Sequence, residues 1–147
     1  MTDYDFITTR LATGGALTGP DDVDQLIVDG ITAVIDCSSE VDDAPLFAKA
    51  RIVYLWNGTP DDGLPKPAEW FKRSLEFALP LLAQPHTRVL AHCTGGVQRG
   101  PSTAYCILRA LGYTAPAAAA VIRAARPIVG LAYRADADAA VQALGYA

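Results

Sequence analysis

The chain has 147 residues, of which 51% are hydrophobic and 19% are charged, so it is long enough for one globular domain with a sizeable core. Its formal net charge of −4 gives no general attraction to nucleic acid or to an anionic membrane, and any anion site must therefore be local. The three cysteines are widely spaced and only two histidines are present, which argues against a disulfide framework and against a structural zinc site. No apolar run is long enough to span a bilayer, and we expect a cytoplasmic protein.

The first thirty residues indicate a strand followed by a helix. The segment DFITTRLATGG, residues 5–15, is predicted to form one opening strand that ends at its two glycines. Residues 19–30 follow with helical spacing, and Leu26 and Ile27 are expected on the inner face of that helix. The glycine at the end of this segment is a typical helix stop.

Three short runs rich in β-branched and other apolar residues are typical of strands buried on both faces. They are residues 31–37, 51–56 and 87–92. Between the last two, residues 67–83 have helical spacing, and Pro80 is expected to bend or end that helix.

The remainder of the chain is predicted to be helical. The predicted helices are residues 100–113, 114–127 and 136–144. The inner face of the first carries Cys106, Ile107 and Leu111, and the second is rich in alanine, the best helix former. Strands that alternate with helices predict a single α/β domain over residues 1–147, with three layers and a central, mainly parallel sheet flanked by helices.

The stretch HCTGGVQRGPS, residues 92–102, follows a predicted strand and precedes a predicted helix. Ligands of such sheets bind beyond the carboxyl ends of the strands, where a helix N-terminus offers backbone N–H groups and a favourable dipole to a phosphate. Arg99 can bind two phosphate oxygens at once. The same field favours the thiolate of Cys93, which is then placed to attack phosphorus in line and to form a phosphocysteine.

The other residues of this loop are assigned by position. Gly95 and Gly96 allow the backbone to curl tightly around an anion. Gln98 is a candidate for positioning the attacking water, although its side chain could equally face solvent. The residues expected to line the bound phosphate are Thr94, Gly95, Gly96, Val97, Gln98 and Gly100.

A second loop carries two acids. The segment GTPDDGLP, residues 58–65, follows a predicted strand, and its glycines and prolines flank Asp61 and Asp62. Expelling an alkoxide or phenoxide from phosphorus requires a proton, which a carboxylic acid on such a loop can supply before it acts as a base toward water. A simple turn without a catalytic role is the alternative, since Pro-Asp-Gly sequences form turns by themselves.

The loop with His92, Cys93 and Arg99 resembles the HC-x5-R signature of cysteine-dependent protein phosphatases, specifically of the dual-specificity branch. The segments RLATGG, LIVDGITAVIDC and AARPIVG resemble further segments of that family in the same order, so the resemblance runs from about residue 10 to residue 133. Two more segments, DCSSEVDDAP and PDDGLP, are similar to the phosphatases of regenerating liver.

This resemblance implies a tyrosine-phosphatase-like fold and the hydrolysis of phosphomonoesters, phosphotyrosine first and phosphoserine or phosphothreonine as further candidates. It assigns the nucleophile to Cys93, the phosphate-binding side chain to Arg99 and the general acid and base to Asp62, with Asp61 as the fallback. His92 is expected to orient the loop and to help keep the thiolate stable. No metal or other cofactor is required, because Arg99, backbone amides and the helix dipole supply the electrostatic stabilisation.

Gly100 departs from the family, in which a serine or threonine usually follows the arginine and donates to the cysteine sulfur. Glycine offers no hydroxyl, so we expect slow breakdown of the phosphocysteine and a less affected first step. Ser102 and Thr103 lie further along the helix and are not expected to replace this donor.

The other two cysteines, Cys37 and Cys106, are expected to have different roles. Cys106 is expected in the core, where a free cysteine behaves as a small hydrophobe. Cys37 is a buried strand residue by its context, but the resemblance to the phosphatases of regenerating liver implies a reversible disulfide with Cys93.

Three alternatives stay open. They are a phosphate-binding pseudophosphatase module, a phosphatase of phosphoinositides or small molecules, and a sulfur-transfer enzyme of the rhodanese type. The expected partner is a phosphorylated protein or a small phosphomonoester, with no nucleic acid and no membrane, and the expected oligomeric state is a monomer.

Overall fold

The computed structural model describes residues 2–146 and has a five-stranded sheet with helices on both faces. Its elements are β1 (Tyr4–Phe6), β2 (Leu11–Gly14), α1 (Pro20–Val28), β3 (Ala33–Ser38), α2 (Ala44–Phe47), β4 (Val53–Thr59), α3 (Ala68–Leu82), β5 (Val89–His92), α4 (Arg99–Ala110), α5 (Ala115–Ala125) and α6 (Arg134–Ala143). The strand order is β1-β2-β5-β3-β4, in which β1 is antiparallel to β2 and every other neighbouring pair is parallel. The predicted α/β class with a mainly parallel sheet is confirmed.

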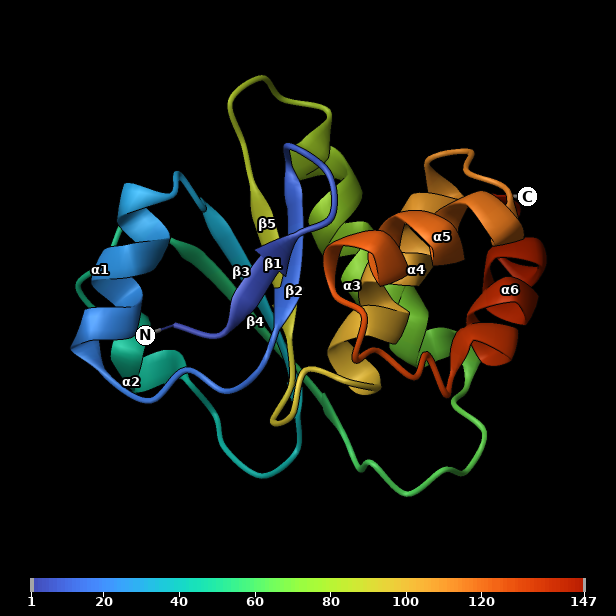
Figure 1. The fold of residues 1–147 in the computed structure, drawn as a ribbon, viewed down its shortest axis with the longest axis horizontal. Coiled ribbons are helices and arrows are strands. Elements are labelled where there is room, and N and C mark those ends of the chain that lie inside the picture. Colours follow the sequence, from blue (N-terminus) through green and yellow to red (C-terminus); the bar gives the residue numbers. More distant parts are fainter. Residues whose placement is uncertain (1, 147) are drawn as a thin grey trace.

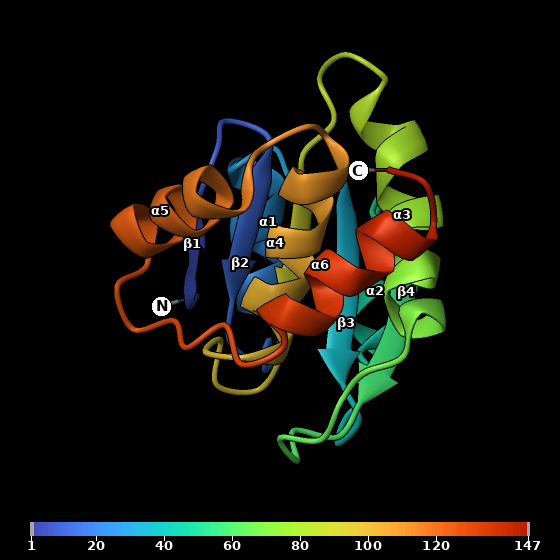
Figure 2. The ribbon, with the colours of Figure 1, turned by 90° about the vertical axis from the view of Figure 1, so that its right-hand side faces the viewer.

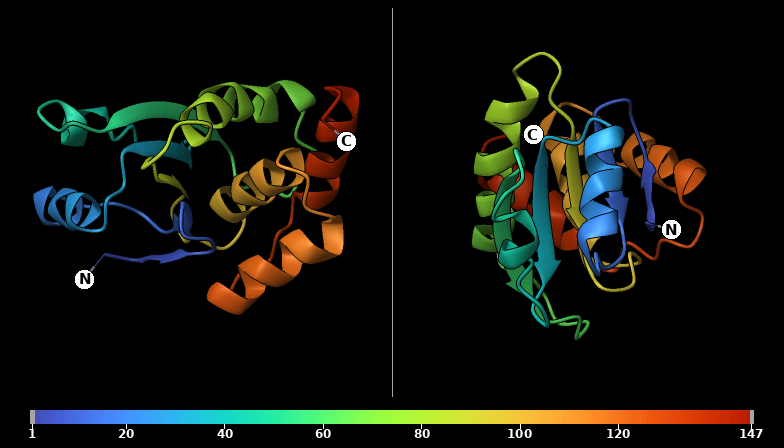
Figure 3. Two further views of the ribbon diagram at one scale, coloured as in Figure 1. Left: turned by 90° about the horizontal axis from the view of Figure 1, so that it is seen from above. Right: turned by 90° about the vertical axis from the view of Figure 1, so that its left-hand side faces the viewer.

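The helices form two layers around the sheet. Helices α1 and α2 cover one face, and α3, α4, α5 and α6 cover the other (Figure 1). Figure 2 shows the larger helical layer in front of the sheet, and the right-hand view of Figure 3 shows the smaller one. Each face has its own apolar core, so a parallel sheet buried on both sides explains the short apolar strands in the sequence.

The central strands agree with the expected burial, but the edge strand does not. All residues of β3 and β5 are buried, because each of these strands lies between two neighbours. Strand β4 was expected to be buried on both faces, yet Val53 and Trp56 are exposed. The reason is its place at the edge of the sheet, which apolar composition alone does not reveal.

Other differences are local. The opening segment is a hairpin of β1 and β2 instead of one strand, and the hydroxyl of Thr8 accepts from the backbone N–H groups of Arg10 and Leu11 in the turn. Ile27 is 54% exposed, because Val23 and Leu26 form the inner face of α1. Leu111 is 50% exposed, because α4 ends at the residue before it.

Helices α3 and α2 differ in how they compare with expectation. Helix α3 agrees with the predicted range of 67–83 and continues to Leu82, two residues beyond Pro80, so it does not end at the proline. Proline removes one backbone hydrogen bond because its nitrogen carries no hydrogen. The short helix α2 had no counterpart among the predicted elements.

The carboxyl ends of β3, β4 and β5 meet at one edge of the sheet, at the bottom of Figure 1. The loops of residues 39–43, 60–67 and 93–98 all leave the sheet there, and the segment of residues 126–133 approaches from the helical side (Figure 1). This edge is therefore where the candidate site lies. Within residues 2–146, no helix combines the length and the apolar character needed to cross a bilayer.

Candidate active site

The loop after β5 is tied to the rest of the protein by its carbonyl groups. The carbonyl of Thr94 accepts from the N–H of Ala16 at 2.9 Å, and that of Gly96 accepts from Nε of Arg126 at 2.9 Å. The carbonyl of Val97 accepts from the N–H of Gly130 at 2.9 Å. In a trans peptide the N–H of the next residue points the opposite way. The N–H groups of residues 95, 97 and 98 therefore point away from these outer partners, as an anion-binding loop requires.

Gly96 is required by this geometry, whereas Gly95 is not. Gly96 has φ +68°, and a Cβ there would collide with Nη2 of Arg126 and lie 2.7 Å from the carbonyl carbon of Gly14. A Cβ at Gly95 would meet nothing nearer than 3.8 Å. The loop is therefore closed by the packing of Arg126 and the end of β2 against Gly96.

Arg99 lies at the start of α4 and is only 3% exposed. Its Nη1 donates to both carboxylate oxygens of Glu40, at 3.0 and 2.9 Å, and to the carbonyl of Thr59 at 2.9 Å. Its Nη2 donates to the hydroxyl of Thr94 at 3.3 Å. Its buried Nε has no hydrogen-bond partner within residues 2–146. One edge of the guanidinium is thus held by the protein, and the Nε edge keeps a free donor.

Glu40 is a functional residue that sequence reasoning missed. It lies in the loop after β3, and this position beyond the carboxyl end of a predicted strand is the signal that could have identified it. The hydrogen bond from Arg99 holds the pKa of Glu40 below its ordinary value. Burial lowers the pKa of Arg99, but the bond to Glu40 and the nearby Cys93 outweigh it, so that pKa is raised. Arg99 therefore stays charged.

Cys93 lies at the beginning of the loop and is 2% exposed. Its N–H donates to the carbonyl of Gly14 at 3.1 Å. Beside it is a cavity of about 330 Å³. The residues that line this cavity are Ala16, Leu17, Thr18, Ser38, Glu40, Val41, Asp43, His92, Cys93 and Thr94.

Gly100 packs directly against β5. A Cβ at this position would lie 2.9 Å from the carbonyl carbon of His92, 3.0 Å from its Cα and 3.1 Å from the carbonyl oxygen of Ala91. These are backbone atoms of a central strand and cannot move cheaply. A glycine here allows α4 to approach the strand that carries Cys93, which gives the residue a structural reason in addition to the missing hydroxyl.

The two hydroxyls that follow are engaged elsewhere. The hydroxyl of Ser102 accepts from the N–H of Tyr133 at 3.3 Å. The hydroxyl of Thr103 lies 3.3 Å from Sγ of Cys37, which donates to it. Burial raises the pKa of Cys37 well above its ordinary value, and burial also raises the pKa of Cys106 to about 12. Both thiols are buried, and the core position expected for Cys106 is confirmed.

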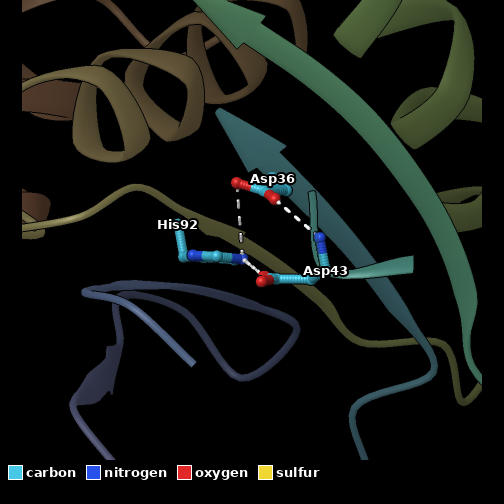
Figure 4. A group of neighbouring side chains, drawn as sticks. All are labelled: Asp36, Asp43 and His92. Atoms are coloured by element: carbon cyan, nitrogen blue, oxygen red, sulfur yellow. Dashed lines mark hydrogen bonds and ion pairs between the residues drawn. The ribbon is translucent and has the colours of Figure 1, made fainter. Parts of the chain in front are cut away.

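His92 is held by acidic side chains, as Figure 4 shows. Its Nδ1 lies 3.3 Å from the carbonyl of Cys93, and its Nε2 lies 2.8 Å from Oδ2 of Asp43. The contact with Asp43 is close, but the two atoms are out of line for a hydrogen bond. Oδ1 of Asp36 is 3.8 Å from the same ring nitrogen. This arrangement fixes the imidazole next to the backbone of Cys93.

Asp36, Asp43 and His92 are also the three residues of a possible metal site, with one ligand atom each within 4.8 Å of the others. The oxygens of Asp36 are already occupied, because Oδ1 accepts from the N–H and the hydroxyl of Ser38 and Oδ2 accepts from the hydroxyl of Tyr54. Burial raises the pKa of Asp36 above its ordinary value. The group is therefore better described as a hydrogen-bonded network that supports the loop.

The two acids of the second loop have different partners. Oδ1 of Asp62 accepts from Nζ of Lys66 at 2.9 Å, and this bond holds the pKa of Asp62 below its ordinary value. Oδ1 of Asp61 accepts from the hydroxyl of Tyr133 at 2.8 Å. Both residues are exposed and lie in the loop that follows β4.

Gln98 serves the loop through its side chain. Its Oε1 accepts from the N–H of Ala132 at 2.7 Å, and a Cβ on Gly130 would collide with its amide. Gln98 therefore connects the loop after β5 to the segment before α6. No contact that the structure records for this side chain points toward Cys93.

Comparison with known proteins identifies solved structures that share this fold. The sequence matches no protein-family model and no curated protein. Human DUSP28 is similar in structure, with a TM-score of 0.81 and 15% identity over 99% of this chain and 97% of that one. PTPMT1 in complex with PI(5)P has a TM-score of 0.79 and 16% identity over 96% and 98% of the two chains.

A third similar structure is the human tyrosine phosphatase-like serine/threonine/tyrosine-interacting protein, with a TM-score of 0.80 and 17% identity over 100% of both chains. Identities this low show the architecture and leave the activity open. The chain therefore has the three-layer α/β fold of the tyrosine and dual-specificity phosphatases.

Proposed function

We propose that this chain is a phosphatase that hydrolyses phosphomonoesters through a phosphocysteine intermediate on Cys93. The observation that carries the proposal is the buried Nε of Arg99, a charged donor without a partner within residues 2–146. Burying such a donor without an acceptor costs free energy, and a phosphate oxygen would satisfy it. Glu40 and Thr59 hold the opposite edge of the guanidinium, so the free edge is oriented before the ligand arrives.

The first chemical step transfers the phosphoryl group to the protein. The thiolate of Cys93 forms the S–P bond while the P–O bond to the leaving group breaks, and an aspartic acid of the second loop gives its proton to the leaving oxygen. Arg99 and the loop N–H groups stabilise the charge on the transferred oxygens. The resemblance assigns the acid to Asp62, with Asp61 as the alternative.

The second step releases phosphate. The aspartate, now a carboxylate, takes a proton from water as the water oxygen attacks phosphorus, and the S–P bond breaks to restore the thiolate. Gly100 offers no hydroxyl to the departing sulfur, and the recorded contacts of Ser102 and Thr103 are with Tyr133 and Cys37. We therefore propose that breakdown of the phosphocysteine is the slow step.

The cavity beside Cys93 supports an aromatic phosphomonoester as the substrate. Its walls include the apolar side chains of Ala16, Leu17 and Val41, and its charged residues are the acids Glu40 and Asp43. No lysine or arginine within residues 2–146 lines it. An apolar wall suits the ring of phosphotyrosine, whereas acidic side chains repel additional phosphates of the kind that a phosphoinositide carries.

Hydrolysis of 4-nitrophenyl phosphate tests the proposal. We expect turnover in the wild-type protein, none in Cys93→Ser, and unchanged turnover in Cys106→Ser, a control that alters a buried cysteine outside the site. A wild-type protein that binds a phosphotyrosine peptide without releasing phosphate would instead be a pseudophosphatase. A panel of phosphotyrosine, phosphoserine and phosphothreonine peptides and PI(5)P then identifies the substrate class, and faster turnover of PI(5)P than of every peptide would contradict the argument from the cavity.

A further inference from the structure

The acid-bearing loop of residues 60–66 is fastened at several points, although its sequence reads as a mobile turn. The N–H of Lys66 donates to Oδ2 of Asp136 at 3.1 Å, and the N–H of Gly63 donates to the hydroxyl of Tyr133 at 3.0 Å. Both acceptors belong to α6 or to Tyr133, the N-cap residue just before it. The position of the loop is therefore set by α6 and its N-cap.

Lys66 is the centre of this attachment. It is only 7% exposed, and its Nζ donates to the carbonyl of Pro60 at 2.6 Å and to Oδ1 of Asp62 at 2.9 Å. The ammonium also lies 4.8 Å from the centre of the Tyr133 ring, within range of a cation–π interaction. A buried ammonium needs an anionic partner, and Asp62 is the carboxylate that provides it.

Asp61 is held differently, by a neutral donor. The hydroxyl of Tyr133 accepts from Gly63 and donates to Oδ1 of Asp61 at 2.8 Å. Burial raises the pKa of Tyr133, so this side chain remains a phenol and keeps its proton. Within residues 2–146, Oδ2 of Asp61 accepts no hydrogen bond, and neither does Oδ2 of Asp62.

Asp61 also faces the phosphate-binding arginine. The backbone of Thr59, two residues before Asp61, accepts from Nη1 of Arg99 at 2.9 Å. The charge of Asp61 is close enough to Arg99 to add to the causes that raise the pKa of the guanidinium, after Glu40 and Cys93. The beginning of the loop is thus attached to the phosphate site, and Lys66, at the end of the loop, binds Asp62.

We propose that Lys66 and Tyr133 are positioning residues that divide the roles of the two acids, so that Asp61 is the general acid and Asp62 is the structural counter-ion of Lys66. The inference rests on the proposed phosphatase function. It replaces the assignment that the resemblance makes, since the ammonium of Lys66 donates directly to Asp62 and favours its carboxylate form, whereas the donor to Asp61 is the neutral phenol of Tyr133.

The test compares two leaving groups in two matched variants. Asp61→Asn and Asp62→Asn each remove one charge and keep an acceptor for Tyr133 or Lys66. General acid catalysis contributes about 10²–10⁴-fold and matters most when the leaving group is a poor one. We expect Asp61→Asn to lower kcat/KM within this range for phenyl phosphate and markedly less for 4-nitrophenyl phosphate. Asp62→Asn should lower both equally, by at most about fivefold.

A double variant tests the role of Lys66. Lys66→Met frees Asp62, so we expect Lys66→Met/Asp61→Asn to hydrolyse phenyl phosphate faster than Asp61→Asn alone. Lys72→Met is the control, because it removes the same charge from the exposed pair with Glu76 and should change nothing. Thermal unfolding establishes which variants are folded. If Lys66→Met does not fold, the comparison of Asp61→Asn with Asp62→Asn tests the roles of the two acids without it.

Three results would overturn the inference. They are a leaving-group-dependent loss in Asp62→Asn, equal losses for both substrates in Asp61→Asn, and no recovery in a folded Lys66→Met/Asp61→Asn. Failure of the proposed function itself is distinguishable, because it appears as absent turnover in the wild-type protein or as turnover that survives in Cys93→Ser.

Discussion

Replacing Gly100 separates the two reasons for a glycine directly after Arg99. Gly100→Ala adds only a methyl group, which would lie 2.9 Å from the carbonyl carbon of His92 and 3.0 Å from its Cα. Overpacking of this kind costs about 1–3 kcal/mol, and the higher helix propensity of alanine offsets about 1 kcal/mol of it. We expect a net loss of up to about 2 kcal/mol in the free energy of unfolding, or up to roughly 8 °C in Tm.

Gly100→Ser adds a hydroxyl to the same steric cost. A hydrogen bond to a charged group contributes about 1.5–3 kcal/mol, and each 1.4 kcal/mol is roughly tenfold in rate. If the hydroxyl reaches the sulfur of Cys93, breakdown of the phosphocysteine should be at least about tenfold faster in Gly100→Ser than in Gly100→Ala. The ratio of these two variants isolates the hydroxyl, because both carry the same Cβ.

The assay is rapid mixing with 4-nitrophenyl phosphate, together with urea unfolding of each variant. The wild-type protein should show a burst of 4-nitrophenol followed by slow turnover, and Gly100→Ser should show a smaller burst. A Gly100→Ala protein more stable than the wild type by about 1 kcal/mol, the gain from helix propensity alone, would refute the packing argument. Equal turnover in the serine and alanine variants would refute the argument from the hydroxyl.

Three further predictions follow from the cores and the loop. Arg126→Met should reduce stability by about 1–3 kcal/mol in urea unfolding, because the carbonyl of Gly96 loses its buried donor, whereas Arg123→Met should have little effect. Burial raises the pKa of Cys106 to about 12. Its contribution to stability is therefore complete below the unfolded pKa of about 8.5 and is lost as pH rises toward 12. Between pH 8 and pH 10, the free energy of unfolding should fall less in Cys106→Ala than in the wild type. Peroxide treatment should link Cys37 to Cys93 in a peptide map, in the wild type and in Cys106→Ser, and the absence of that link in both would end the disulfide hypothesis.

Much of the fold could be predicted from the sequence because its signals are local. The apolar runs of β3 and β5 lie between neighbouring strands, so burial on both faces is a property of the run itself. The alanine-rich helix α5 agrees closely with the predicted range, because helix propensity acts within the segment. The exposed side of β4 and the hairpin of β1 and β2 depend on strand order and pairing, which no short window contains.

The candidate site likewise combines features contained in one sequence segment with contacts between distant segments. The sequence by itself determined a cysteine and an arginine separated by five residues on a strand-to-helix loop, because that spacing is contained in one segment. Only the tertiary structure placed Glu40 on Arg99, packed Gly100 against the backbone of His92, and bound Asp62 to Lys66 and Asp61 to Tyr133. These contacts join segments far apart in the chain and depend on the crossing of helices and loops at one edge of the sheet. Adjacent residues such as Asp61 and Asp62 can therefore differ in chemistry, because each is defined by the distant side chain that it meets.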